Sequence, residues 1–302
     1  MTTNRPFNKI FEETSDEDSN HFNGINGDDH AEALDGEDFP LVDDLDQQIV
    51  MHRDAHFSGS FDLMIEYYKG EGKGEGKGTL PELEIPRMKE LAIIERDSEE
   101  SLSSILLDDA GRDQVAKAKD AYFKLRAIYE VKNPITKHPQ LIADLILSEE
   151  VDSVKEIETI VAEGPSIVPA LINLLVDEDF LNPLSPGYGY APAYAAICLG
   201  LLKDARAIRP LFERMSCENS VVEESVLVAL EEIGEESKVF CLKVLQSRPI
   251  TYDNENAAII LASAFLEDPE TIAVAKKQIE DPAMKNNPLI FQCLSDICPK
   301  HS

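Results

Sequence analysis

The sequence contains no tryptophan and no apolar run long enough to cross a membrane. Its longest apolar runs, residues 167–176 and 257–266, are about ten residues each, whereas a membrane-spanning helix needs roughly 20. Residues 1–15 also lack the apolar core that a secretory signal requires. We therefore predict a cytoplasmic protein that has no transmembrane helix and no membrane partner.

Cysteine is scarce, and its spacing is not that of a metal site. The chain has 5 cysteines, all between Cys198 and Cys298, and no two of them form a Cys-x-x-Cys pair. The number is odd and the neighbouring segments are apolar, which favours buried, reduced thiols over disulfides or zinc ligands. Nothing else in the composition indicates a cofactor, so we predict none.

Basic residues are also few. The chain has 28 lysines and arginines against 58 aspartates and glutamates, which gives a formal net charge of −30. A field of this sign repels phosphate groups. We therefore expect no nucleic-acid partner and favour protein partners.

Four segments differ in composition. Residues 1–45 carry acidic clusters among Asn, Ser and Gly with no helical or strand period, which predicts a disordered acidic tail. This tail is either a solubilising segment or a mimic of an acidic ligand. Residues 46–69 form a short docking segment, and residues 70–80 form a Gly-rich linker whose GEGKGEGKG run lacks the residues of a phosphate-binding loop. Residues 81–302 form the helical domain.

The docking segment contains a short amphipathic helix. Phe61, Met64, Ile65 and Tyr68 follow a helical spacing, with Ser60 available as the N-cap and Gly70 as the terminator. A helix of about two turns is not stable alone. We expect it to pack either on the first repeats of the solenoid in the same chain or on a partner.

Before this helix, His52, Asp54 and His56 form an H-x-D-x-H pattern. In an extended segment these alternate side chains point to one side. Two imidazoles and a carboxylate are ligands for zinc or non-haem iron. The alternative is a hydrogen-bonded loop that orients the following helix.

From about residue 150 onward, pairs of apolar helices joined by tight turns recur. In register, Leu199, Leu202, Asp204, Ile208 and Leu211 match Leu230, Ile233, Glu235, Val239 and Leu242. Such units bury their apolar faces only by stacking on one another, which predicts a helical solenoid. The insertion 177–190 separates two units, and its aromatic residues either contact a ligand or fold back on their own repeat.

The segments SIVPALINLL (166–175), AAICLGLLKDARAIRPL (195–211) and VLVALEEIG (226–234) resemble HEAT repeats, and are most similar to the short HEAT-like units of phycobilisome lyases. The resemblance implies an all-α fold, an α-solenoid of stacked HEAT-like hairpins. It also implies a concave binding face formed by the second helix of each pair. Repeats of this kind serve scaffolds, adaptors, lyase subunits and some DNA glycosylases, so the fold does not define the activity.

Basic residues concentrate on these second helices, and they suggest a partner. The candidate contact residues are Arg206, Arg209, Arg214, Lys243 and Lys277. We hypothesise that they bind an acidic peptide and that residues 1–45 compete for the same face. The alternative is that these bases only form screened surface pairs with nearby acids.

The sequence shows no adjacent acid, base and nucleophile apart from the His52 to His56 segment. A non-enzymatic interaction scaffold or adaptor explains the repeats, the tail and this lack of catalytic groups together. The alternative is a HEAT-like enzyme or enzyme subunit, a lyase or a metal-dependent activity that uses the histidine segment.

Overall fold

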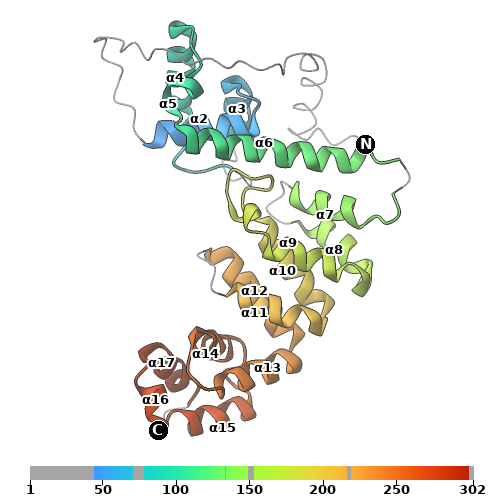
Figure 1. Ribbon diagram of the computed structural model, residues 1–302, viewed down its shortest axis with the longest axis vertical. Coiled ribbons are helices and arrows are strands. Elements are labelled where there is room, and N and C mark those ends of the chain that lie inside the picture. Colours follow the sequence, from blue (N-terminus) through green and yellow to red (C-terminus); the bar gives the residue numbers. More distant parts are fainter. Residues whose placement is uncertain (1–43, 71–77, 133, 149–152, 216–218, 299–302) are drawn as a thin grey trace. The chain divides into compact units, whose positions relative to one another are not determined.

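The computed structural model describes residues 44–70, 78–132, 134–148, 153–215 and 219–298. All regular elements in these ranges are helices (Figure 1), which confirms the all-α prediction. No helix in the described ranges is both long and apolar enough to cross a membrane. The predicted acidic tail and most of the predicted linker lie outside the described residues.

The chain divides into two units, Met1–Tyr122 and Phe123–Ser302. The sequence pattern placed a domain boundary at residue 81, whereas the division of the structure falls within helix α6. The helices of the first unit are α2 (Asp44–His56), α3 (Phe61–Lys69), α4 (Ile85–Ser98), α5 (Leu102–Leu106) and the first part of α6 (Asp109–Glu130).

Helix α3 forms as predicted. The Ser60 side chain accepts a hydrogen bond from the backbone N–H of Leu63, and Gly70 ends the helix. The apolar stripe is buried, and α3 packs on α4 within the first unit. Helix α4 lies at the start of residues 81–302, the region that the sequence assigned to the solenoid, so α3 packs within its own chain. Met64, Met88 and Leu102 belong to the same apolar core, which therefore joins α3, α4 and α5.

The second unit consists of paired helices. They are α7 (His138–Ile146), α8 (Val154–Ala162), α9 (Val168–Val176), α10 (Ala191–Leu202), α11 (Ile208–Arg214), α12 (Ser220–Ile233), α13 (Glu235–Leu245), α14 (Tyr252–Ala264), α15 (Pro269–Gln278), α16 (Pro282–Lys285) and α17 (Pro288–Ile297). Proline occupies the first turn of several of them, where its missing N–H has no helical partner to lose.

Nine of these helices form two layers, which their contacts define; Figure 1 shows their order along the chain. Helices α8, α10, α12, α14 and α17 contact one another in chain order, and we call them the first-helix layer. Helices α9, α11, α13 and α15 do the same and form the second-helix layer. Each pair also packs internally or on the next pair, so one continuous apolar core runs between the layers. This order is the one that stacked helical hairpins require.

The closest approach in the first-helix layer is between α10 and α12, at Gly200. A Cβ atom placed on Gly200 would lie 2.6 Å from the Cα atom of Ala229 and 3.3 Å from its carbonyl oxygen. Because both of these are backbone atoms of a packed helix, neither can move without shifting the whole helix. Glycine is therefore required at this position in α10.

We expect Gly200→Ala to destabilise the second unit by about 1–3 kcal/mol, because the added methyl group forces the two helices apart. In a helix with free space around the glycine, the same substitution stabilises the protein by roughly 0.5–1 kcal/mol. The sign of the change in stability therefore shows whether the two helices are in close contact at Gly200. Gly111→Ala in α6 is the control, since its nearest contact is a side-chain oxygen at 3.3 Å. The free energy of unfolding of both variants is measured by urea titration. A stabilised Gly200→Ala protein would contradict the close approach.

The insertion 177–190 folds back on its own unit. Phe180 and Leu181 pack against the core, and Ser185 to Gly187 are buried. Gly187 has a φ of +83° and lies against the carbonyl of Ile146, 2.4 Å from where a Cβ would be. The structure supports the interpretation that the insertion folds back on its own repeat. Tyr190 remains 38% exposed.

The four described cysteines are free thiols. Cys198, Cys241 and Cys293 are buried as predicted, and Cys298 is half-buried. Burial raises the pKa of Cys198 and of Cys241 to about 12. Both therefore stay protonated at neutral pH and are poor nucleophiles and metal ligands.

Candidate functional site

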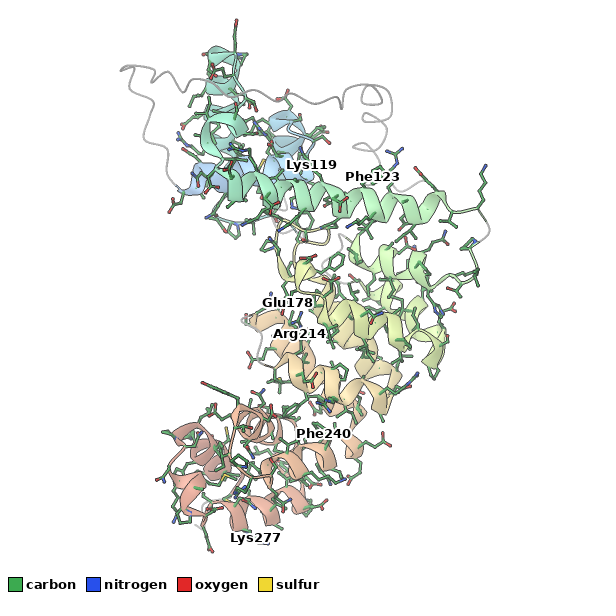
Figure 2. The ribbon with its side chains drawn as sticks, in the orientation of Figure 1. Lys119, Phe123, Glu178, Arg214, Phe240 and Lys277 are labelled. Carbon is green, nitrogen blue, oxygen red and sulfur yellow. The ribbon has the colours of Figure 1, made fainter. Side chains whose placement is uncertain are left out.

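The outward side of the second-helix layer is the surface that the sequence predicted to bind a partner. In α13 the buried side chains Ser237, Cys241 and Leu245 face the core, so Glu236 and Lys243 lie on the opposite, exposed side. Helices α11 and α15 likewise bury one side against the core and expose the opposite side. We call this surface the second-helix face. Figure 2 draws the side chains, with Lys277 of this face labelled.

Arg206 and Arg209 point outward as predicted, but each is already paired. Arg206 donates from Nε and Nη2 to the carboxylate of Asp204 at 2.8 and 2.6 Å, and from Nη2 to the carbonyl of Pro165 at 2.8 Å. Arg209 donates from Nε to Glu213 at 2.7 Å, one helical turn along α11. The hydrogen bonds from Arg206 also lower the pKa of Asp204. Both guanidinium charges are therefore offset by neighbours on the same helix or turn.

Arg214 was predicted to be a contact residue, and the structure places it elsewhere. Its side chain is only 11% exposed. Its Nε donates to the carbonyl of Leu175 at 2.8 Å, close to the C-terminus of α9, and its Nη1 lies 4.0 Å from Glu178 (Figure 2). A cation at a helix C-terminus satisfies a carbonyl that has no helical partner. Arg214 therefore joins α11 to α9 and is not an outward contact residue.

Lys243 and Lys277 are exposed, and within the described ranges neither forms an ion pair. They lie near the C-terminal ends of α13 and α15, two helices that contact each other. Lys276 stands beside Lys277 and is exposed too. Of the five predicted contact residues, these two lysines alone have the exposure and unpaired charge that binding an anion requires.

Lys238 belongs to the same helix but has a structural role. Its side chain is 6% exposed, and its Nζ lies 2.8 Å from Glu235, 3.1 Å from Asp268 and 3.3 Å from Glu270. These carboxylates raise its pKa, with the hydrogen bond to Glu235 the largest cause. The lysine therefore ties α13 to the start of α15.

The histidine segment is helical, so the predicted extended conformation is wrong. His52, Asp54 and His56 all lie in α2. In a helix, residues four apart share a face and the residue between them does not. The two imidazoles lie together, with ring centroids 4.6 Å apart, while Asp54 binds Arg53 and Ser103. The three predicted ligands do not converge, and no group of three such side chains in the described ranges could hold a metal ion.

The two histidines are instead part of a buried aromatic cluster. Nδ1 of His56 lies 2.8 Å from the hydroxyl oxygen of Tyr122. The His52 ring packs edge-on against Phe57 and Tyr68. Burial lowers the pKa of His52 to about 4, although a hydrogen bond with the backbone of Gly78 opposes this shift. His52 is therefore neutral at physiological pH.

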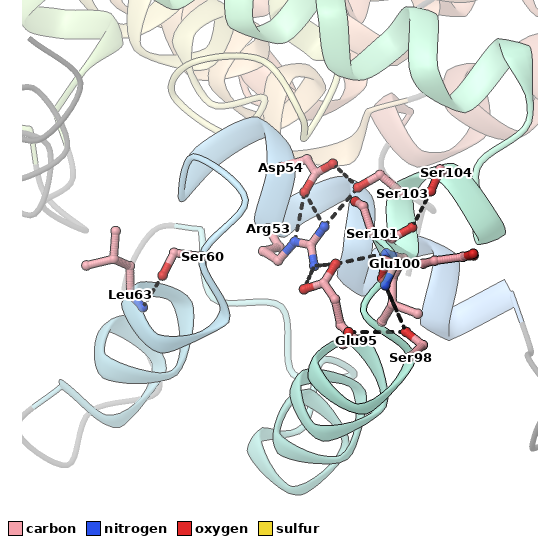
Figure 3. A network of polar contacts seen from close by, with 11 residues as sticks. Arg53, Asp54, Ser60, Leu63, Glu95, Ser98, Glu100, Ser101, Ser103 and Ser104 are labelled. Atoms are coloured by element: carbon pink, nitrogen blue, oxygen red, sulfur yellow. Dashed lines mark hydrogen bonds and ion pairs between the residues drawn. The ribbon is translucent and has the colours of Figure 1, made fainter. Parts of the chain in front are cut away.

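A buried arginine next to this cluster was missed by the sequence reasoning (Figure 3). Arg53 donates from Nη1 to both carboxylate oxygens of Glu95 at 2.8 Å, from Nη2 to Ser103 at 2.8 Å and from Nε to Asp54 at 2.8 Å. Its guanidinium also lies 4.5 Å from the centre of the Phe61 ring. This network joins α2 to α3, α4 and α5. The arrangement links four helices of the first unit.

The chain matches no protein-family model, no curated protein and no solved structure. The resemblance to HEAT repeats therefore stays a prediction that rests on the quoted segments. The layered order of the helices and the chemistry of the exposed side chains are the observations from which a function can be proposed.

Proposed function

We propose that this protein is a non-enzymatic interaction scaffold, a HEAT-like solenoid whose second unit binds an acidic segment of a partner protein on the second-helix face. One observation carries the proposal. Lys243 and Lys277 lie exposed on two neighbouring second helices without ion pairs in the described part of the chain. An exposed cation that is not already paired can form a charge-assisted hydrogen bond with an incoming carboxylate.

The distribution of charge supports an acidic ligand at this end of the face. Lys276 adds a third exposed cation beside Lys277. The arginine end of the face is weaker, because Arg206 and Arg209 would have to leave Asp204 and Glu213 to bind a partner. We therefore centre the site on α13 and α15 rather than on α11. The alternative function, a metal-dependent enzyme, has no support from the geometry of the histidine segment.

The test is a quantitative pull-down from the native lysate with the full chain. We expect Lys243→Glu/Lys277→Glu to retain about tenfold less of its partner than the wild type, because the exposed cations become anions that repel a carboxylate. The matched control is Lys137→Glu/Lys155→Glu, which makes the same charge change at two exposed lysines of the second unit, one just before α7 and one on α8. Wild type and control are expected to retain the partner equally.

An acidic peptide added as competitor gives a second measurement. A Glu-rich peptide is expected to displace the partner from the wild type, and a Lys-rich peptide of equal length is not. Equal retention by both double variants, or displacement by the Lys-rich peptide alone, would show that the second-helix face is not an acid-binding site.

A further inference from the structure

An apolar patch lies on the outward side of the first-helix layer, on the side of the second unit opposite the second-helix face. Leu201 of α10 and Val221 and Val228 of α12 are 45%, 45% and 49% exposed. We call these three residues the valine patch. About half of the surface of each of these residues is open to solvent.

The close approach of α10 and α12 brings these side chains to one side. Gly200 faces Ala229 across the contact. Leu199 and Leu230, their neighbours on one side, are fully buried in the core. Leu201 and Val228, the neighbours on the other side, must then point together toward solvent, because successive residues in a helix are about 100° apart. Val221 precedes Val228 by two turns and shares its direction.

The core does not need these valines. Helix α12 already buries Val222, Val226, Ala229 and Leu230. On a purely solvated face, β-branched residues lower helix propensity relative to Glu, Lys or Gln. Single exposed apolar residues are ordinary, whereas three on the same outward side of two packed helices favour a docking surface.

Carboxylates border the patch on α12. Glu224 and Glu231 flank the two valines on the side away from α10, are exposed, and form no ion pair within the described ranges. Glu232 flanks them on the side toward α10 and is bound 3.0 Å from Lys203. Lys203, the base at the edge in the described part of the chain, is therefore neutralised, while two carboxylates remain unpaired. The surface is apolar at its centre and negative at its border.

We propose that the valine patch binds a basic amphipathic helix of a partner protein. Its apolar side chains would cover Leu201, Val221 and Val228, and its lysines or arginines would meet Glu224 and Glu231. Charge decides among the possible occupants, since the same carboxylates repel an anionic membrane and also repel the identical acidic border of a second copy. Together with the proposed acid-binding face, this gives the second unit two opposite faces with opposite charge preference.

The probe is a labelled peptide of about 14 residues made only of leucine and lysine, with the leucines at helical spacing, followed by fluorescence anisotropy with the full chain. A scrambled peptide of the same composition is the control for simple charge attraction. We expect the amphipathic peptide to bind about tenfold more tightly than the scrambled one at an ionic strength of about 0.15 M. Equal binding of the two peptides would overturn the proposal.

Variants of the chain separate patch binding from general attraction to an acidic protein. Leu201→Asp/Val228→Asp is expected to weaken binding about tenfold, although it makes the protein more negative. Val176→Asp is a single-substitution control, since Val176 is 47% exposed on α9 in the other layer, and it is expected to bind like the wild type. Unchanged or tighter binding by the double variant would mean that charge alone attracts the peptide, and would overturn the proposal.

A second variant covers the case in which the double aspartate variant fails to fold. Glu224→Gln/Glu231→Gln changes no apolar contact and is expected to weaken binding measurably while leaving the circular dichroism spectrum unchanged. Lys243→Glu/Lys277→Glu is expected to bind the peptide as the wild type does. The two faces are therefore tested independently, and failure of one does not decide the other. Unchanged binding by the glutamine variant would contradict the role of the carboxylate border.

Discussion

Replacing Arg53 with methionine is expected to destabilise the first unit by about 3–5 kcal/mol, because removal of one partner leaves a buried charge without compensation. The Arg53 side chain is 2% exposed, and its partners Asp54 and Glu95 are 10% and 24% exposed. Both carboxylates are therefore mostly shielded from solvent. Methionine keeps most of the volume but donates no hydrogen bond, so Asp54, Glu95 and Ser103 lose the group that holds them together.

Hydrogen exchange followed by mass spectrometry is the suitable measurement, since it reports each unit separately. Protection is expected to fall in residues 44–70 and 78–122 and to persist in the second unit. Arg96→Met is the control on the same helix as Glu95. Arg96 is 72% exposed and forms an ion pair with the exposed Asp97, so its loss should change stability by less than about 0.5 kcal/mol. A loss below about 1 kcal/mol for Arg53→Met would show that the network does not hold the unit together.

Helix α3 could be predicted because its signals are local. Its cap, its apolar spacing and its terminator all lie within residues 60–70. Helix α2 could not be predicted in the same way, because it buries charge and not only apolar side chains. Asp46, His52, Arg53 and His56 are all buried, so no apolar stripe appears in the sequence. Arg87, which binds Asp46, lies 41 residues away along the chain.

The basic residues of the second unit show a similar limit. The helical wheel correctly places Arg206 and Arg209 outward, and their pairing with Asp204 and Glu213 is also local in sequence. The role of Arg214 is not local, since its acceptor is the carbonyl of Leu175, 39 residues earlier. A residue that bonds to the preceding pair of helices has the same sequence signature as one that faces solvent. Only the packing of α9 against α11 distinguishes the two.

The valine patch was missed for a related reason. In the sequence, Val221 and Val228 are indistinguishable from Val222 and Val226, which are buried in the core. A helix that is apolar on two sides has no single stripe, so the outward residues are read as core. The burial of Gly200 against Ala229 sets the rotation of both helices and thereby decides which side faces outward.

Acidification is expected to destabilise the first unit through His52. The unfolded histidine titrates near its ordinary value of 6.5, and the folded one near a pKa of about 4. Between these values the unfolded state binds a proton that the folded state does not, so stability falls as the pH falls. The contribution is fully present above pH 6.5. Linkage gives a loss of about 2 kcal/mol at pH 5 and up to about 3 kcal/mol at lower pH.

The measurement is the free energy of unfolding of the first unit between about pH 7 and pH 5, a range in which most carboxylates stay ionised. His52→Phe keeps a flat ring among Phe57 and Tyr68 but cannot titrate. Because the substitution also changes stability at neutral pH, the free energy of unfolding of each protein is compared with its own value at neutral pH. The variant is expected to lose less stability than the wild type over this range, by about 2 kcal/mol. His138→Gln, in the second unit, is the control and is expected to behave as the wild type in the first unit.

Two outcomes would contradict this account. A wild-type first unit that keeps its stability down to pH 5 would show that His52 is protonated without cost. A His52→Phe protein that loses as much as the wild type would assign the acid response to other groups. If His52→Phe instead makes the free energy of unfolding of the first unit less dependent on pH, then His52, which the sequence suggested as a metal ligand, acts as a buried neutral ring. Its neutrality would then be a condition for the packing of α2 against the aromatic side chains of α3.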